Sequence, residues 1–258
     1  MPHVTQFRID RLAVEIHADR AELGRAAAAR AASILREGIA REGRAAAVFA
    51  AAASQNEFLA ALRADRSIDW ARVTAFHLDE YAGLPASHPA SFRRFLRERL
   101  MDHVPLAAFH ELRGDAADLA AEAARYQSLL AAQPPVLAAL GIGENGHLAF
   151  IDPGECDFAD PRDVRMVHLD DICRMQQVHD GAFERVENVP RGALSLTVPF
   201  FLRTPHAVVA APGASKRRAV QAALEGPIEE RCPASALRRH ADAVLYLDGD
   251  SADLVNRP

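Results

Sequence analysis

The sequence predicts an α/β protein with a single-domain, three-layer Rossmann-like fold around a mostly parallel, doubly wound sheet. Short apolar runs of strand length alternate with longer segments of helical periodicity, an order that favours a parallel sheet covered by helices. No internal repeat, low-complexity linker or block of like charge interrupts the chain. Its 258 residues suffice for one large domain, so we expect residues 1–258 to fold as one unit.

The composition argues against several classes of protein. A net charge of −5 offers no basic excess that would attract nucleic acid or an anionic membrane. No apolar run approaches the ~18 residues of a membrane-spanning helix, and residues 1–11 lack the plan of a signal peptide. The cysteines are far apart and form no CxxC pair, which favours a reducing compartment. We therefore expect a cytoplasmic protein with no nucleic-acid or membrane partner.

The first part of the chain predicts an extended lead, a helix, a buried strand and a second helix. Gly43 ends the first helix. The small residues at 51–54 form a turn between strand and helix, where free N–H groups suit an anion. The expected bounds are 4–16 for the lead, Asp19 or Glu22 to Glu42 for the helix, 45–50 for the strand and 55–63 for the second helix.

The rest of the chain continues the alternation of strands and helices, with one exception. Residues 153–190 are polar and weakly periodic, so we expect them to form an excursion that acts as a lid. The expected strands lie at 72–78, 136–140, 193–198, 206–211 and 243–247, and the expected helices at 89–101, 116–132 and 216–224.

A glycine-rich loop follows the strand at 136–140. Glycines at 141, 143 and 146 let the backbone approach a ligand closely. The same loop holds three polar side chains: Asn145, His147 and Asp152.

Two further strand ends carry polar groups, and the carboxyl ends of parallel strands meet at the edge where ligands bind. One of these ends carries Asp79. The other leads to Lys216, the sole lysine, which starts a helix and suits a phosphate, as does Ser54 after an earlier strand. If a phosphate binds at this edge, Asp79 and His147 would lie close to it. A carboxylate and an imidazole in that position suit proton transfer on a phosphorylated sugar.

Each of these groups also has a structural explanation. Asp79 is a typical turn or cap residue, and His147 and Asp152 could serve the loop itself. Ser215 is a common N-cap residue. His77 shares a strand face with Asp79 and could join His147 in a metal site, but no helical HxxxH motif or cysteine pair supports one. We therefore expect no metal.

Four blocks of sequence occur in a set order: FHLDEYAGLP at 76–85, GIGENGHLAF at 141–150, VPRGAL at 189–194 and GASK at 213–216. Together they resemble the glucosamine-6-phosphate deaminase (isomerase) and 6-phosphogluconolactonase family, over most of the chain. The first two blocks favour the deaminases. The resemblance implies an enzyme that converts glucosamine 6-phosphate to fructose 6-phosphate and ammonia without a cofactor.

The resemblance also implies roles for individual residues. Asp79 would be the general base that moves a proton from C2 to C1, and His147 would assist opening of the pyranose ring. Asp152 would orient and charge His147. The other implied site residues are Asn145 in the catalytic loop, and Ser54, Gln55, Glu80, Gly146, Arg174 and Lys216 as ligands of the sugar or its phosphate.

Three features depart from the family's pattern. Asp152 stands where glutamate is frequent, so its contact with His147 must be rebuilt or bridged by water. Alanines at 51–53 replace a glycine-rich phosphate turn, so the backbone must take another path and Gln55 could supply a donor. Arg174 does not align cleanly with the family's lid arginine and is a candidate phosphate ligand.

Two other functions fit the same residues. A 6-phosphogluconolactonase-like hydrolase would use His147 to activate water and could dispense with Asp79. A non-catalytic sugar-phosphate-binding protein would explain the shorter Asp152 and the altered turn. In each case the expected partner is a small phosphorylated sugar, an amino sugar for the deaminase. The sequence does not determine the oligomeric state, and a homo-oligomer is compatible with it.

Overall fold

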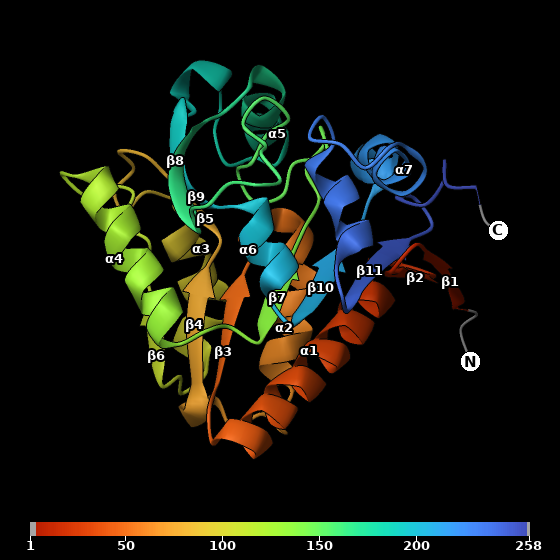
Figure 1. The fold of residues 1–258 in the computed structure, drawn as a ribbon, viewed down its shortest axis with the longest axis horizontal. Helices are drawn as coiled ribbons and strands as arrows, with labels where there is room; N and C mark the ends of the chain where they lie inside the picture. The colour runs from red at the N-terminus through yellow and green to blue at the C-terminus, as the bar shows by residue number, and fades with distance from the viewer. Residues whose placement is uncertain (1–3, 257–258) are drawn as a thin grey trace.

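The computed structural model describes residues 4–256, and its centre is an eight-stranded sheet flanked by helices (Figure 1). The strand order is β1-β2-β11-β10-β7-β3-β4-β6, and every neighbouring pair is parallel except β1 and β2. The predicted fold class is confirmed. Residues 1–3 and 257–258, which the single-domain and signal-peptide predictions included, lie outside the described residues. The strands are β1 (Thr5–Ile9), β2 (Leu12–His17), β3 (Ala45–Phe49), β4 (Val73–His77), β6 (Ala108–His110), β7 (Leu137–Leu140), β10 (His206–Ala210) and β11 (Ala243–Asp248).

The five predicted helices begin and end close to the expected positions, whereas α5 and α6 were not predicted. The Asp19 carboxylate caps α1 by accepting from the Glu22 amide, and Gly43 ends that helix in the left-handed conformation. Gly24 lets α1 approach α2, because a Cβ there would lie 2.7 Å from Glu57. The helices are α1 (Arg20–Glu42), α2 (Asn56–Ala64), α3 (Phe92–Arg99), α4 (Leu119–Ala132), α5 (Asp171–His179), α6 (Val198–Arg203) and α7 (Arg217–Glu225).

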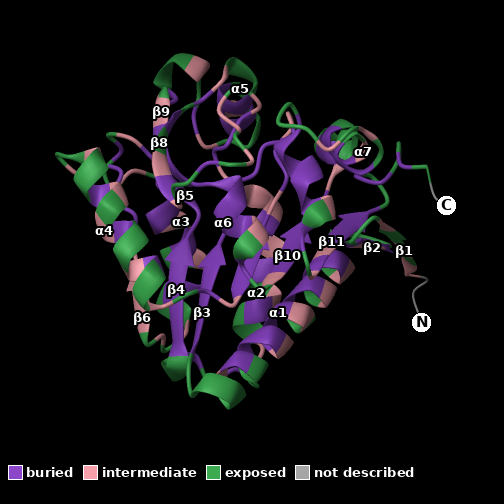
Figure 2. Ribbon diagram, viewed as in Figure 1, coloured by how far each residue is buried: buried purple, intermediate pink, exposed green. Residues whose placement is uncertain are grey.

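The central strands are buried on both faces. Figure 2 shows them buried along their length, whereas the helices alternate between buried and exposed residues. Strands β3 and β7 are built largely from alanine, and each of their residues is buried. Small side chains let helices pack close to the sheet, so the alanine content of the chain serves the core.

A second, three-stranded antiparallel sheet sits beyond the carboxyl end of β4. Its strands are β5 (Asp79–Tyr81), β9 (Gly192–Leu196) and β8 (Val164–His168), in the order β5-β9-β8. The strand predicted at 193–198 therefore belongs to this sheet, and its expected place in the parallel sheet was wrong. Hydrophobic periodicity identifies a strand but not its partner, and this partner is the chain that leaves β4 through Leu78.

The excursion at 153–190 is regular in part. It contains β8 and the helix α5, which the Asp170 carboxylate caps by accepting from the Cys173 amide. In Figure 1, α5 lies beyond the carboxyl ends of the parallel strands. Among residues 4–256, no helix combines the length and hydropathy needed to span a bilayer.

Candidate active site

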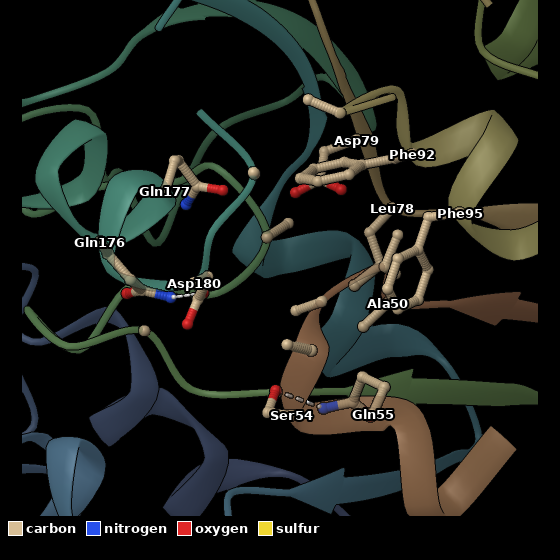
Figure 3. Close-up of a pocket in the computed structure, with 18 of the residues that line it drawn as sticks. Ala50, Ser54, Gln55, Leu78, Asp79, Phe92, Phe95, Gln176, Gln177 and Asp180 are labelled. Atoms are coloured by element: carbon tan, nitrogen blue, oxygen red, sulfur yellow. Dashed lines mark hydrogen bonds between the residues drawn. The ribbon is translucent and has the colours of Figure 1, made fainter. Parts of the chain in front are cut away.

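A cavity of about 260 Å³ lies at the carboxyl edge of the parallel sheet, between that edge and α5 (Figure 3). Ligand pockets of ~300–1,000 Å³ accept drug-sized molecules, so this volume suits a small metabolite. Strands β3, β4, β7 and β10 are neighbours in the parallel sheet, which explains why their ends converge here. The predicted site residues that line the cavity are Ser54, Gln55, Asp79, His147 and Lys216.

Asp79 is the first residue of β5 and faces the cavity with 5% of its surface exposed (Figure 3). Its carboxylate accepts no hydrogen bond from the residues that the structure describes. Burial raises the pKa of Asp79 well above its usual range, and the charge of neighbouring Glu80 adds to the rise. Once ionised, such a carboxylate is a stronger base than one in water.

His77 holds the backbone of Asp79 in place. Its Nδ1 lies 2.9 Å from the Asp79 carbonyl oxygen, which can only accept, so Nδ1 carries the proton. Nε2 accepts from the Leu112 amide at 2.8 Å. Complete burial lowers the pKa of His77 to about 3, so the ring is neutral at physiological pH. His77 does not line the cavity, and the metal site considered for it with Asp79 and His147 has no support here.

The glycines of the 141–150 loop place the ring of His147. A Cβ at Gly143 would lie 2.2 Å from the atoms Cε1 and Nε2 of that ring, so only glycine allows the ring to lie there. The Gly143 amide also donates to the His147 carbonyl at 3.0 Å. Gly146 has a φ of 86°, which closes the turn. The glycines thus serve the histidine's position.

Asp152 supports His147 directly. Its Oδ1 lies 3.2 Å from His147 Nδ1 and accepts from Asn145 Nδ2 at 2.9 Å. Its Oδ2 accepts from the Asp170 amide, also at 2.9 Å. Burial alone would raise the pKa of Asp152, but His147 and the hydrogen bonds from Asn145 and Asp170 outweigh burial and lower it. The shorter carboxylate therefore approaches the histidine ring too closely for a bridging water, as a charge contact rather than an aligned hydrogen bond. Asn145 and Asp152 lie behind His147 and outside the cavity lining.

The turn after β3 reaches the cavity without positive φ. Ala52 is extended at φ −151° and ψ 158°, and none of the residues at 51–53 is left-handed. Gln55 fixes this turn, since its Nε2 lies 3.2 Å from Ser54 Oγ and donates to the Ala210 carbonyl at 3.1 Å. The expectation of another backbone path is confirmed, and Gln55 holds Ser54 in place.

Lys216 provides the buried positive charge of the cavity, with 4% of its surface exposed. Burial lowers the pKa of Lys216, and the carboxylates of Asp180 and Glu144 partly oppose that effect. Its ammonium forms no ion pair within 4.0 Å among residues 4–256. A buried ammonium without such a partner favours an anionic ligand.

Besides Asn145 and Asp152, three further predicted site residues do not line the cavity. Glu80 is fully buried, pairs with Arg93 at 3.1 Å and accepts from backbone amides at the start of α3. Arg174 donates to the Val186 carbonyl and therefore holds the end of the excursion. Gly146 lies against the Cys232 side chain.

The cavity wall opposite Asp79 comes from α5 and the residues that follow it. Figure 3 shows Gln176, Gln177 and Asp180 across the cavity from Asp79. We did not predict these side chains as site residues, since only their polarity within the excursion marked them. Phe92 and Phe95 of α3 add an apolar side, which no pattern in the sequence indicated.

The family model described as glucosamine-6-phosphate isomerases/6-phosphogluconolactonase matches residues 18–246. The chain belongs to this family. A glucosamine-6-phosphate deaminase of Bacillus cereus (strain B4264) is 36% identical over 189 residues, which are 73% of this chain and 70% of the relative. One from Bacillus thuringiensis (strain Al Hakam) is 35% identical over the same shares.

Solved structures of the family share the fold. That of a monomeric glucosamine-6-phosphate deaminase superimposes with a TM-score of 0.86 at 29% identity, covering 93% of this chain and 99% of that one. A 6-phosphogluconolactonase from Trypanosoma brucei gives a TM-score of 0.77 at 18% identity, covering 98% and 100%. Because the lactonase is only 18% identical to this chain, its structural similarity is evidence for the shared fold alone.

Proposed function

We propose that this chain is a glucosamine-6-phosphate deaminase, which converts glucosamine 6-phosphate and water to fructose 6-phosphate and ammonia. The observation that carries the proposal is one cavity lined by a buried carboxylate, Asp79, an imidazole, His147, and a buried ammonium, Lys216. The identity to relatives named glucosamine-6-phosphate deaminase supports this choice of substrate.

In this mechanism the phosphate binds beside Lys216 and Ser54. Lys216 then gains the anion that its burial favours, and Ser54 Oγ, steadied by Gln55, supplies a hydroxyl. Binding at this corner places the sugar ring between Asp79 and His147. The amides of Gln176 and Gln177 face the sugar hydroxyls from α5.

His147 opens the pyranose ring. Its Nδ1 faces Asp152, which leaves Nε2 for the cavity and the ring oxygen. Asp152 is ionised because its pKa is lowered, and it stabilises the imidazolium form that donates a proton to the leaving ring oxygen. Asn145 and Asp170 keep the Asp152 carboxylate in place.

Asp79 then moves a proton along the open-chain sugar. It removes the proton from C2, and the C1–C2 double bond that forms receives a proton at C1. The amine at C2 becomes an imine, which water hydrolyses to the ketone and ammonia. The raised pKa of Asp79 brings it closer to the working pH, where a general base is most effective.

An ammonia-release assay with glucosamine 6-phosphate, coupled to detection of fructose 6-phosphate, tests the proposal. We expect both products in equal amounts. Hydrolysis of 6-phosphogluconolactone without ammonia release would instead support the lactonase alternative. Saturable binding of glucosamine 6-phosphate with neither product would support a binding protein.

We further propose that residues 153–190 act as a lid within a single domain and that one copy of the chain forms a complete site. In support, α5 residues Gln176 and Gln177 line the cavity, and the similar glucosamine-6-phosphate deaminase of known structure is described as monomeric. The deaminase is then active as a monomer, and a homo-oligomer is not required for the chemistry.

A further inference from the structure

A cluster of three metal-binding side chains lies directly behind the cavity. His147, Asp152 and Cys173 each offer a ligand atom, and these atoms lie within 4.8 Å of one another. All three residues are buried, and they come from the catalytic loop and α5. The proposed deaminase chemistry uses the histidine and the carboxylate but has no task for the thiol.

The Nδ1 atom of His147 marks this cluster as a ligand site. The His147 side chain is only 9% exposed, and its Nδ1 approaches Asp152 at 3.2 Å. That approach lacks the alignment of a hydrogen bond, so Nδ1 is a buried polar atom without a hydrogen-bond partner among the described residues. Buried polar atoms of this kind are rare and call for an explanation.

The donor set selects a particular class of cation. A thiolate, an imidazole and a carboxylate suit Zn²⁺ and related thiophilic ions, whereas Mg²⁺ and Ca²⁺ prefer oxygen ligands alone. Three protein ligands plus one water complete a tetrahedral zinc site. The Asp152 oxygens keep lone pairs beyond those used by the Asn145 and Asp170 donors, so the carboxylate can ligate without losing its supports.

We propose that His147, Asp152 and Cys173 form a binding site for a thiophilic divalent cation such as Zn²⁺, and that this cation inhibits the enzyme. Binding would release the thiol proton to solvent and form bonds from the metal to Cys173 Sγ, His147 Nδ1 and an Asp152 oxygen. With Nδ1 bound, Nε2 keeps its proton and His147 can no longer exchange protons with the ring oxygen. The inhibition, although not the binding, rests on the proposed deaminase function.

Cobalt binding tests the site independently of activity. Chelator-treated protein is titrated with Co²⁺, whose thiolate ligation gives a charge-transfer absorption band, and Zn²⁺ is then added in competition. We expect one equivalent of Co²⁺ with this band, displaced by Zn²⁺. Cys173→Ser should abolish the band and weaken affinity by at least ~100-fold, beyond the ~10–100-fold loss typical of outer-shell changes. The double variant Cys156→Ser/Cys232→Ser keeps Cys173 as its only thiol and should retain the band.

The activity measurement separates this proposal from the deaminase proposal. We expect Zn²⁺ to inhibit ammonia release by the wild type, with recovery after chelation, and Cys173→Ser to resist inhibition at the same Zn²⁺ concentration. Thermal melts confirm that the variant is folded, and Cys173→Ala serves if it is not. A wild type without the thiolate band, or a band or inhibition that persists without Cys173, overturns the metal site. A cobalt band in a protein that releases no ammonia overturns only the deaminase function.

Discussion

The hydroxyl of Tyr81 donates a 2.6 Å hydrogen bond to Oε1 of Gln177. Tyr81 ends the short strand that begins with Asp79, and Gln177 lies in α5, so this bond ties the base-bearing strand to the opposite wall of the cavity. Both residues are buried, so water cannot take the place of the lost partner when this hydrogen bond is broken. The distance between the two walls therefore depends on this pair.

Tyr81→Phe should weaken the attachment of α5 to strand β5. Loss of the hydroxyl leaves Gln177 Oε1 without its donor, at a cost of about 1–3 kcal/mol in the free energy of unfolding. We expect a lower midpoint of thermal unfolding and a larger change in KM than in kcat. Tyr246→Phe is the matched control, because Tyr246 is also buried but its hydroxyl makes no hydrogen bond with the described residues. Equal effects of the two substitutions would contradict the assigned link.

Asp79→Asn should remove the base and keep the binding site. We expect kcat to fall by ~10²–10⁴ and hydrogen exchange at C2 in deuterated water to stop, while the Kd of a phosphorylated sugar stays within about two-fold. Because the pKa of Asp79 is raised, wild-type kcat should increase as pH rises through that pKa and the carboxylate ionises. Glu98→Gln, at the exposed rim of the same cavity, is the control and should change little. Wild-type turnover by Asp79→Asn would refute the assignment.

Lys216→Ala should act on binding. A charge-assisted hydrogen bond contributes about 1.5–3 kcal/mol, so KM should rise roughly 10- to 150-fold with kcat little changed. Arg217→Ala, which removes the next cation in the chain from an exposed side chain, should leave KM near the wild-type value. Steady-state kinetics decides the matter, and a large fall in kcat at constant KM would count against a phosphate ligand.

Gly143→Ala should displace the imidazole of His147, which we propose opens the sugar ring. The new Cβ would lie 2.2 Å from the His147 ring, so the ring must leave its present position. We expect kcat to drop by at least ~10²-fold, the scale of a lost general acid or base. Gly154→Ala is a matched control, because a Cβ there meets no atom within 4 Å. Retained activity in Gly143→Ala would show that the ring position is not required.

His77→Asn should flatten the pH dependence of stability. The pKa of His77 is about 3 in the folded protein and near 6.5 when unfolded, so its stabilisation is complete above about pH 6.5 and is lost as pH falls toward 3. Urea unfolding at pH 7 and pH 4.5 should therefore show a smaller difference for His77→Asn than for the wild type. His168→Asn, at a histidine side chain that is 87% exposed, should behave like the wild type. An unchanged pH dependence in His77→Asn would contradict this assignment.

Local chemistry made much of the fold predictable. The Asp19 cap, the Gly43 stop and the apolar run at 137–140 are each decided by neighbouring residues, and the structure places them as expected. The strand at 192–196 shows the limit, because its partner Asp79 lies more than 100 residues away. Pairing over such a distance depends on tertiary contacts that periodicity does not encode.

The site residues that belong to the recognisable sequence blocks were predictable. Asp79 and His147 were identified from their blocks, and both line the cavity. Glu80 belongs to the same block as Asp79 but forms an ion pair with Arg93 instead of lining the cavity. A sequence motif does not show which way each of its side chains points. Asp180 and Gln177 reach the cavity only because α5 folds back over the sheet, and a single sequence gives no sign of that path.

The turn at 51–53 has a thermodynamic consequence of its own. Alanine samples far fewer backbone conformations than glycine in the unfolded chain, and here each residue adopts a conformation that alanine accepts without strain. The turn would thus lose little conformational freedom on binding the proposed phosphate. A glycine-rich version would be more mobile before binding and would surrender more entropy on capture. The proposed phosphate would therefore meet a backbone that is already ordered in its binding conformation.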